Sequence, residues 1–173
     1  MRTLQADDLV LEPQMAAHAA EMFVLLSDPA LYHYLDSGPP TDPAWLAARF
    51  AKLESRQSAD GSEQWLNWVI RTPQRGLAGF VQATVHADGS ANIAYELGTA
   101  FWGRGWATRS TLAMLQELAD QYAVLRAFAT VDKRNLHSIK LLTRLAFTAV
   151  DSRRHPHHGV AEGDWLFVRD PLF

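Results

Sequence analysis

The stretch ELGTAFWGRGWATRS, from Glu96 to Ser110, constrains the fold more than any other part of the chain, because Gly98, Gly103 and Gly105 follow one another closely. Strand-forming residues precede it, and the residues after it have the apolar spacing of a helix. A glycine-rich turn at such a junction lets the backbone approach either another part of the fold or a ligand. The first turn of a helix also carries N–H groups without intrahelical partners and the positive end of the helix dipole. The junction therefore predicts an anion site, with phosphate as the usual guest.

Two common phosphate-binding loops do not fit this stretch. A Walker loop needs a lysine directly after its last glycine, whereas Trp106 follows Gly105. A dinucleotide fingerprint needs a third glycine where Thr108 stands, and an acidic residue at a later strand end that is missing here. Arg104 would add positive charge, and Ala107 is small enough for a close approach. From the local pattern alone, simple packing of a helix on a sheet stays an alternative to a phosphate site.

The rest of the chain alternates between helical and strand patterns without a repeat or a linker. The expected strands cover residues 8–13, 64–71, 77–85, 91–98, 125–131, 147–152 and 165–170, and the expected helices cover 14–28, 41–56, 108–122 and 135–147. Tight turns join the second, third and fourth strands into an antiparallel meander. The helix after the glycines then forms a crossover to a parallel strand. The pattern predicts an α/β (α+β) fold, with a mixed, mainly antiparallel central sheet of about seven strands and flanking helices, in a single domain of residues 1–173.

The composition is that of an ordinary globular protein and excludes several classes. The chain has 173 residues, a formal net charge of −3, 48% hydrophobic residues and no cysteine. There is no basic block for nucleic acid, no thiol nucleophile and no disulfide framework. No apolar run is long enough for a membrane span, and the N-terminus lacks the apolar core of a signal peptide. We therefore expect a soluble, cytoplasmic protein without a nucleic-acid or membrane partner.

Two motifs carry a resemblance to a known family. WGRGWA, Trp102 to Ala107, resembles the Gln/Arg-x-x-Gly-x-Gly/Ala motif of the GNAT superfamily of acyl-CoA-dependent N-acetyltransferases, with tryptophan at the first position. Downstream, RNLHSIKLLTRLAF places Asn135, Ser138 and Phe147 in register with an element of the RimJ/RimL-like branch. The N-terminal region is also similar to that branch, so the resemblance covers nearly all of the chain.

The resemblance implies a fold, a cosubstrate and a site. The sheet would be splayed between the fourth and fifth strands, 91–98 and 125–131, and the pantetheine arm of acetyl-CoA would pair with the opened edge. Acetyl would pass directly from acetyl-CoA to a primary amine, with an oxyanion-stabilising N–H near Leu97. The implied cofactor-binding residues are Glu96, Leu97, Gly98, Trp102, Gly103, Arg104, Gly105, Trp106, Ala107, Thr108, Asn135 and Ser138.

The catalytic residues are less well marked than the cofactor site. Many relatives have a tyrosine seven residues after the motif asparagine as proton donor to the leaving thiolate, and here that position is Leu142. Ser138 would take this role or would only hydrogen-bond the cofactor. Glu96 is the candidate general base, because its side chain points away from Tyr95 and Leu97 on an extended strand. Its alternatives are a surface charge or an ion pair with Arg104.

The acceptor is expected to be a protein N-terminal α-amine or a small-molecule amine. The resemblance places its site near Tyr32, His33 and Asp36, with Tyr34 and Trp68 as further aromatic walls. No metal is expected, because HPHH, residues 155–158, is a poor ligand set and fits a solvated loop that would border the acceptor site. Exposed aromatics such as Trp45 and Trp65 would suit a homodimer. The alternative function is a non-catalytic acyl-CoA-binding or regulatory module of the same fold.

Overall fold

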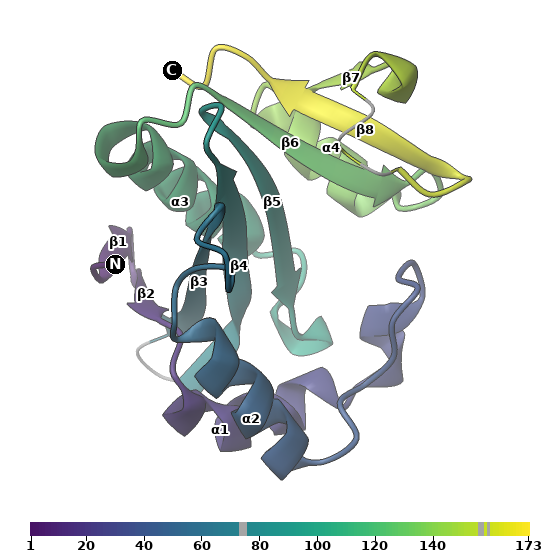
Figure 1. The fold of residues 1–173 in the computed structure, drawn as a ribbon. Coiled ribbons are helices and arrows are strands. Elements are labelled where there is room, and N and C mark those ends of the chain that lie inside the picture. Colours follow the sequence, from purple (N-terminus) through teal and green to yellow (C-terminus); the bar gives the residue numbers. More distant parts are fainter. Residues whose placement is uncertain (73–75, 156–157, 159) are drawn as a thin grey trace.

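The fold is built on one sheet of eight strands in the order β1-β2-β3-β4-β5-β6-β8-β7 (Figure 1). The computed structural model describes residues 1–72, 76–155, 158 and 160–173. The strands are β1 (Leu4–Ala6), β2 (Leu9–Pro13), β3 (Glu63–Thr72), β4 (Gly76–His86), β5 (Ser90–Leu97), β6 (Arg126–Asp132), β7 (Thr148–Val150) and β8 (Asp164–Arg169). The helices are α1 (Ala19–Leu26), α2 (Pro43–Leu53), α3 (Trp106–Tyr122) and α4 (Leu136–Arg144). The predicted mixed fold and antiparallel meander are confirmed, with β1 as a strand that the sequence pattern did not reveal.

The helices cover opposite faces of the sheet, and each face has its own core. The larger core joins α3 and α4 to one face and includes Trp68 and Ile70 of β3. The smaller core joins α1 and α2 to the other face and includes Val69 of the same strand. This alternation is the two-residue period of a strand buried on both sides. The side chain of any strand residue is therefore assigned to the α3 face or to the α1 face by its position.

The predicted apolar helix faces are too wide. The helical spacing of the sequence predicts Met15, Leu112 and Leu136 on buried faces, yet they are 48%, 43% and 60% exposed. Met15 precedes a short 3₁₀ turn, Ala16–His18, and so lies outside α1. A helix that lies on a sheet buries only a stripe of its surface, so residues at the border of the stripe stay in solvent. In the described part of the chain, no helix combines the length and apolarity that crossing a membrane requires.

The splay predicted between the fourth and fifth strands is confirmed between β5 and β6. The two strands pair in parallel at their starts, where Ser90–Asn92 of β5 lie beside Arg126–Phe128 of β6. The pairing ends there, although β5 continues to Leu97 and β6 to Asp132. Figure 1 shows them meeting near the top and diverging downward. A cavity of about 220 Å³ opens where they part, lined by Asn92, Ile93, Phe128, Ala129, Thr130, His158 and Leu166. Among the described residues, no strand pairs with the rest of β5 on this edge.

Candidate active site

The three glycines of the turn after β5 serve two purposes. A Cβ on Gly98 would lie 2.9 Å from Leu25 Cγ, so this glycine lets α1 pack closely against the strand end. Gly103 and Gly105 have φ of +73° and +74°, the left-handed region that favours glycine. Among the described residues, no atom lies within 4 Å of a Cβ added at either position. Packing therefore explains Gly98, whereas the space over Gly103 and Gly105 is open to a ligand.

Replacing Gly98 by alanine is expected to lower the free energy of unfolding by about 1–3 kcal/mol, the usual cost of inserting a methyl group into a packed contact. The added Cβ would have to displace Leu25, which stands too close. Thermal or urea unfolding measures the loss. The second substitution Leu25→Ala should return part of it, and an unchanged midpoint for Gly98→Ala would contradict the packing role.

The N-terminus of α3 has no side-chain cap. Its N-cap is Gly105, which supplies no side-chain hydrogen bond, and its first turn holds no acidic residue. Aromatic contacts hold the turn before it: Trp102 Nε1 donates to the Leu97 carbonyl at 2.6 Å, and the ring of Trp106 stacks on Phe101 at 5.5 Å. The Arg104 guanidinium lies 5.4 Å from the Trp106 ring centre. The helix end is thus a fixed, positively polarised site that suits an anion.

The edge of β5 beside the splay presents backbone groups to the gap. The Gly98 N–H donates to the Ala78 carbonyl of β4 at 3.0 Å. Because peptide groups along a strand alternate between its two edges, those of Leu97 face the splay instead. The Leu97 carbonyl accepts from Trp102, so of the two backbone groups of Leu97 the N–H is the one left to face the gap. The N–H of Leu97, near which the oxyanion donor was predicted, therefore faces the splay.

The Ser138 hydroxyl meets a tyrosine that comes from a distant part of the sequence. Ser138 Oγ lies 2.6 Å from Tyr95 Oη, and the Ser138 N–H donates to Asn135 Oδ1 at 3.1 Å, which caps α4. Burial raises the pKa of Tyr95 to about 12. The sequence contained no signal for this pair, because the two residues are 43 positions apart. Tyr95 belongs to β5, on the other side of the splay.

Glu96 lies on the opposite face of β5, beside Phe80 of β4. Its Oε1 is buried, and in the described part of the chain it has no hydrogen-bond partner. This burial raises the pKa of Glu96 to about 7. Tyr32 is close enough for the Glu96 charge to act on it, although burial is the larger cause that raises the Tyr32 pKa to about 12. A half-buried carboxylate without a partner fits neither a surface charge nor an ion pair with Arg104.

The residues predicted for the acceptor site are only partly brought together. Tyr32 lies on the Glu96 face and packs against the smaller core, where its hydroxyl donates to the Leu26 carbonyl at 2.8 Å. His33 and Asp36 are exposed on the loop between α1 and α2. The prediction of Trp68 as an acceptor-site residue was wrong. Trp68 is fully buried in the core of the α3 face, and its indole N–H donates to the Arg2 carbonyl. Its strand position assigned it to the face away from Glu96.

The loop between α1 and α2 reaches toward the ends of β6 and β8. The Arg134 guanidinium lies 6.0 Å from the ring centre of Tyr34. The pKa of Asp164 is raised first by burial, then by the charges of Asp132 and Asp36. Tyr34 and Asp36 thus lie near groups on the far side of the splay, so this loop borders the gap from the Glu96 face.

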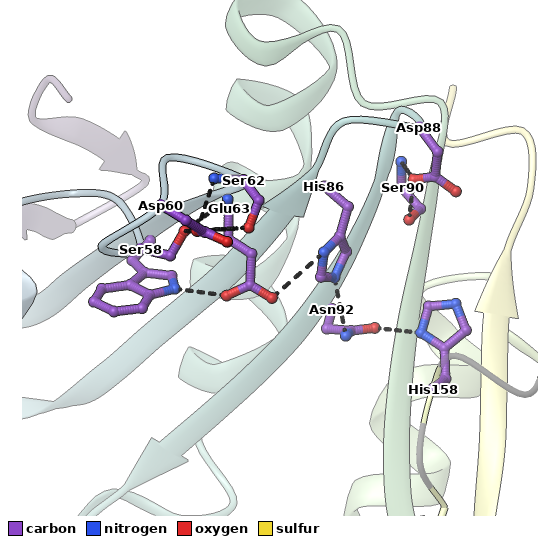
Figure 2. Close-up of polar contacts among 10 residues, drawn as sticks. Ser58, Asp60, Ser62, Glu63, His86, Asp88, Ser90, Asn92 and His158 are labelled. Atoms are coloured by element: carbon purple, nitrogen blue, oxygen red, sulfur yellow. Dashed lines mark hydrogen bonds and ion pairs between the residues drawn. The ribbon is translucent and has the colours of Figure 1, made fainter.

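A chain of polar contacts joins the loop before β8 to β5 at the start of the splay (Figure 2). The Asn92 amide group lies between two histidines, with Nδ2 3.2 Å from His86 Nε2 and Oδ1 2.7 Å from His158 Nδ1. The His158 ring also stacks on Phe128 at 3.8 Å. His158 therefore packs against the sheet, contrary to the expected solvated loop, while residues 156 and 157 of the same motif lie outside the described residues. Within the described residues, no three His, Asp or Glu side chains are grouped to hold a metal ion.

The splayed sheet, the helix end without a side-chain cap and the two titratable groups on either side of β5 lie in one region, and comparison with known proteins gives the class of protein. Residues 8–148 match the family model described as the acetyltransferase (GNAT) domain. Because the match covers most of the chain, the protein belongs to this family and is an acetyl-CoA-dependent acetyltransferase. The resemblance that the two motifs indicated is confirmed.

Individual relatives agree with the family assignment. An uncharacterized N-acetyltransferase p20 of Bacillus licheniformis is 27% identical over 149 residues, 85% of this chain and 83% of its own. The RimL ribosomal L7/L12 α-N-protein acetyltransferase in complex with coenzyme A has a TM-score of 0.82 at 18% identity, covering 98% of both chains. An acetyltransferase from Salmonella typhimurium, which modifies the N-terminal serine of ribosomal protein L7/L12, has a TM-score of 0.77 at 17% identity, covering 98% of this chain and 99% of its own. At such identities the solved structures show that the fold is shared.

Proposed function

We propose that the protein transfers acetyl from acetyl-CoA directly to a primary amine at the uncovered edge of β5. The observation that carries the proposal is the pair of groups on either side of this edge. Glu96, with its pKa raised to about 7 by burial, lies on one face, and the Tyr95–Ser138 pair lies on the other. A base on the acceptor side and a hydrogen-bond donor on the thioester side are what aminolysis of a thioester requires.

The residues of the glycine turn fit acetyl-CoA. The space over Gly103 and Gly105 is open, and the uncapped end of α3 would hold the pyrophosphate through the N–H groups of Trp106 to Thr108. Arg104 would add charge at the same end. The backbone of Glu96 to Gly98 would pair with the pantetheine arm in the manner of an added strand. Asn135 would contribute chiefly by capping α4 and so fixing Ser138.

Three groups of the chain would act on the reacting atoms. Glu96 accepts the proton that the amine must lose, and a pKa of about 7 keeps a large share of this carboxyl ionised at neutral pH. The Leu97 N–H would stabilise the negative charge that develops on the carbonyl oxygen. Ser138 donates a hydrogen bond toward the sulfur. Leu142 is fully buried in the larger core and has an aliphatic side chain, so this position supplies no proton donor.

We infer that the amine enters from the Glu96 face, between the loop after α1 and the loop before β8. Tyr32 would border the reacting nitrogen, and His33 and Asp36 would lie further out, on the exposed loop. Two of the similar structures, the RimL enzyme and the Salmonella typhimurium acetyltransferase, act on the N-terminus of ribosomal protein L7/L12. This supports a protein N-terminal α-amine as acceptor class beside small amines. Cytoplasmic location and a homodimer stay proposals, and the 47% exposure of Trp45 is compatible with the second.

An acceptor screen with detection of the released CoA thiol tests the function, and a thermal-shift titration tests the cosubstrate. Acetyl-CoA at 100 times its Kd is expected to stabilise the fold by about 2.7 kcal/mol. Protein N-terminal peptides and small amines should then release CoA above the background rate. Stabilisation without turnover on a broad panel would favour a non-catalytic acyl-CoA-binding module. A melting temperature that ignores acetyl-CoA would contradict both functions.

A further inference from the structure

The hydroxyl groups of Tyr95 and Ser138 meet across the splay. Tyr95 Oη lies 2.6 Å from Ser138 Oγ and 3.4 Å from the Ser138 carbonyl oxygen. Tyr95 is three residues beyond the last pair between β5 and β6, and Ser138 stands in the first turn of the helix that follows β6. The contact therefore joins the two diverging halves of the sheet on the face opposite Glu96.

Both hydroxyl groups of this contact carry a proton, and either could donate to the other. With a pKa of about 12, Tyr95 keeps its proton at neutral pH. A neutral buried phenol donates its single hydrogen where it can, and both oxygens that it contacts belong to Ser138. When Tyr95 donates to Ser138 Oγ, the closer of the two oxygens at 2.6 Å, the hydrogen of the serine hydroxyl is left to point elsewhere.

The backbone N–H of Ser138 already has a partner. It donates to Asn135 Oδ1, and the Ser138 carbonyl oxygen lies beside the phenol. The serine is thus held from two sides, by the helix cap and by the tyrosine. Its hydroxyl hydrogen is the one that these contacts leave for a further acceptor in the gap.

We propose that Tyr95 is a positioning residue that turns the Ser138 hydroxyl hydrogen toward the sulfur of the thioester. The inference rests on the proposed acetyl transfer. In that step Glu96 receives the amine proton as the nitrogen–carbon bond forms, and Ser138 donates a hydrogen bond to the sulfur as the sulfur takes the electron pair of the broken carbon–sulfur bond. Neither Tyr95 nor Ser138 loses its proton, and water protonates the thiolate on release.

The substitution Tyr95→Phe removes the hydroxyl and keeps the ring. We expect kcat to fall about tenfold, the effect of one hydrogen bond, with the KM for acetyl-CoA unchanged. Ser138→Ala should lower kcat at least as far, and the double variant should be no slower than Ser138→Ala alone, because the tyrosine acts through the serine. Tyr122→Phe, which removes a half-buried hydroxyl from the other end of α3, is the matched control. Unchanged kcat in Tyr95→Phe, or losses that add in the double variant, would overturn the proposal.

A second measurement does not depend on turnover. In the complex with CoA, the thiolate can be titrated by its ultraviolet absorbance. The bound thiol of the unaltered protein should have a pKa about one unit lower than in the Tyr95→Phe and Ser138→Ala complexes, because a directed O–H stabilises the thiolate. Equal thiol pKa values would refute the positioning role. A lowered pKa in a protein that acetylates no amine would support the pair and count against acetyl transfer.

Discussion

Replacing Glu96 by glutamine is expected to lower kcat for amine acetylation by about 10²- to 10⁴-fold, the usual contribution of a general base. The amide has nearly the shape of the carboxyl group but cannot take a proton from the amine. CoA affinity should not change, because the Glu96 side chain lies on the face away from Ser138 and the α3 terminus. Asp120→Asn, which neutralises an exposed carboxylate of α3, is the control. A Glu96→Gln variant with full activity would exclude this residue as the base.

The pH dependence gives the same prediction a sign. Only the ionised carboxylate accepts a proton, so kcat/KM should rise with pH along a limb whose pKa is about 7, the value to which burial raises Glu96. The limb should be absent from the residual activity of Glu96→Gln. An identical limb in both proteins would assign that ionisation to another group.

Stability against pH provides a check that needs no substrate. The Glu96 pKa is raised from its ordinary value of 4.5 to about 7 in the folded protein, so the folded state holds this proton more tightly than the unfolded chain. Its contribution to stability is therefore complete below about pH 4.5 and is lost as the pH rises to about 7. Glu96→Gln should flatten the unfolding free energy over this interval relative to the unaltered protein.

The sequence predicted those features that depend on local pattern. Alternation in β3 to β5, with the turn at Asp88-Gly89, indicated the meander, and the strand–turn–helix junction indicated the parallel crossover. The position of Glu96 opposite Tyr95 followed from the two-residue period of a strand alone. Among the described strands, β1 was not predicted.

Features that depend on contacts between distant segments could not be predicted. Tyr95 and Ser138 are separated by 43 positions, and they meet only because β5 and β6 diverge after three pairs. The prediction of Trp68 as an acceptor-site residue was wrong for a related reason. Its aromatic character fits the wall of such a site, but the packing of helices on the two faces of β3 decides which residues reach it. The position of His158 likewise depends on contacts with Asn92 of β5 and Phe128 of β6.

The substitution Gly105→Glu is expected to weaken CoA binding by about 10²-fold or more, which corresponds to roughly 3 kcal/mol. The new side chain would enter the open space over the turn and place a carboxylate where the pyrophosphate should bind at the end of α3. Isothermal titration with CoA measures the loss. Gly105→Gln separates the filling of the space from the added charge, and should bind CoA with intermediate affinity.

Gly61 provides the matched control for Gly105, because its backbone has nearly the same conformation. Its φ is +73° against +74° at Gly105, and in the described structure neither position has an atom within 4 Å of an added Cβ. Both glutamate variants should therefore lose a similar amount of stability, about 1–2 kcal/mol, from a left-handed residue with a Cβ. Since only Gly105 begins a helix in the splayed region, only Gly105→Glu should lose CoA. Equal CoA affinity in the two variants would mean that Gly105 serves only the left-handed backbone of the turn. The pyrophosphate would then bind elsewhere.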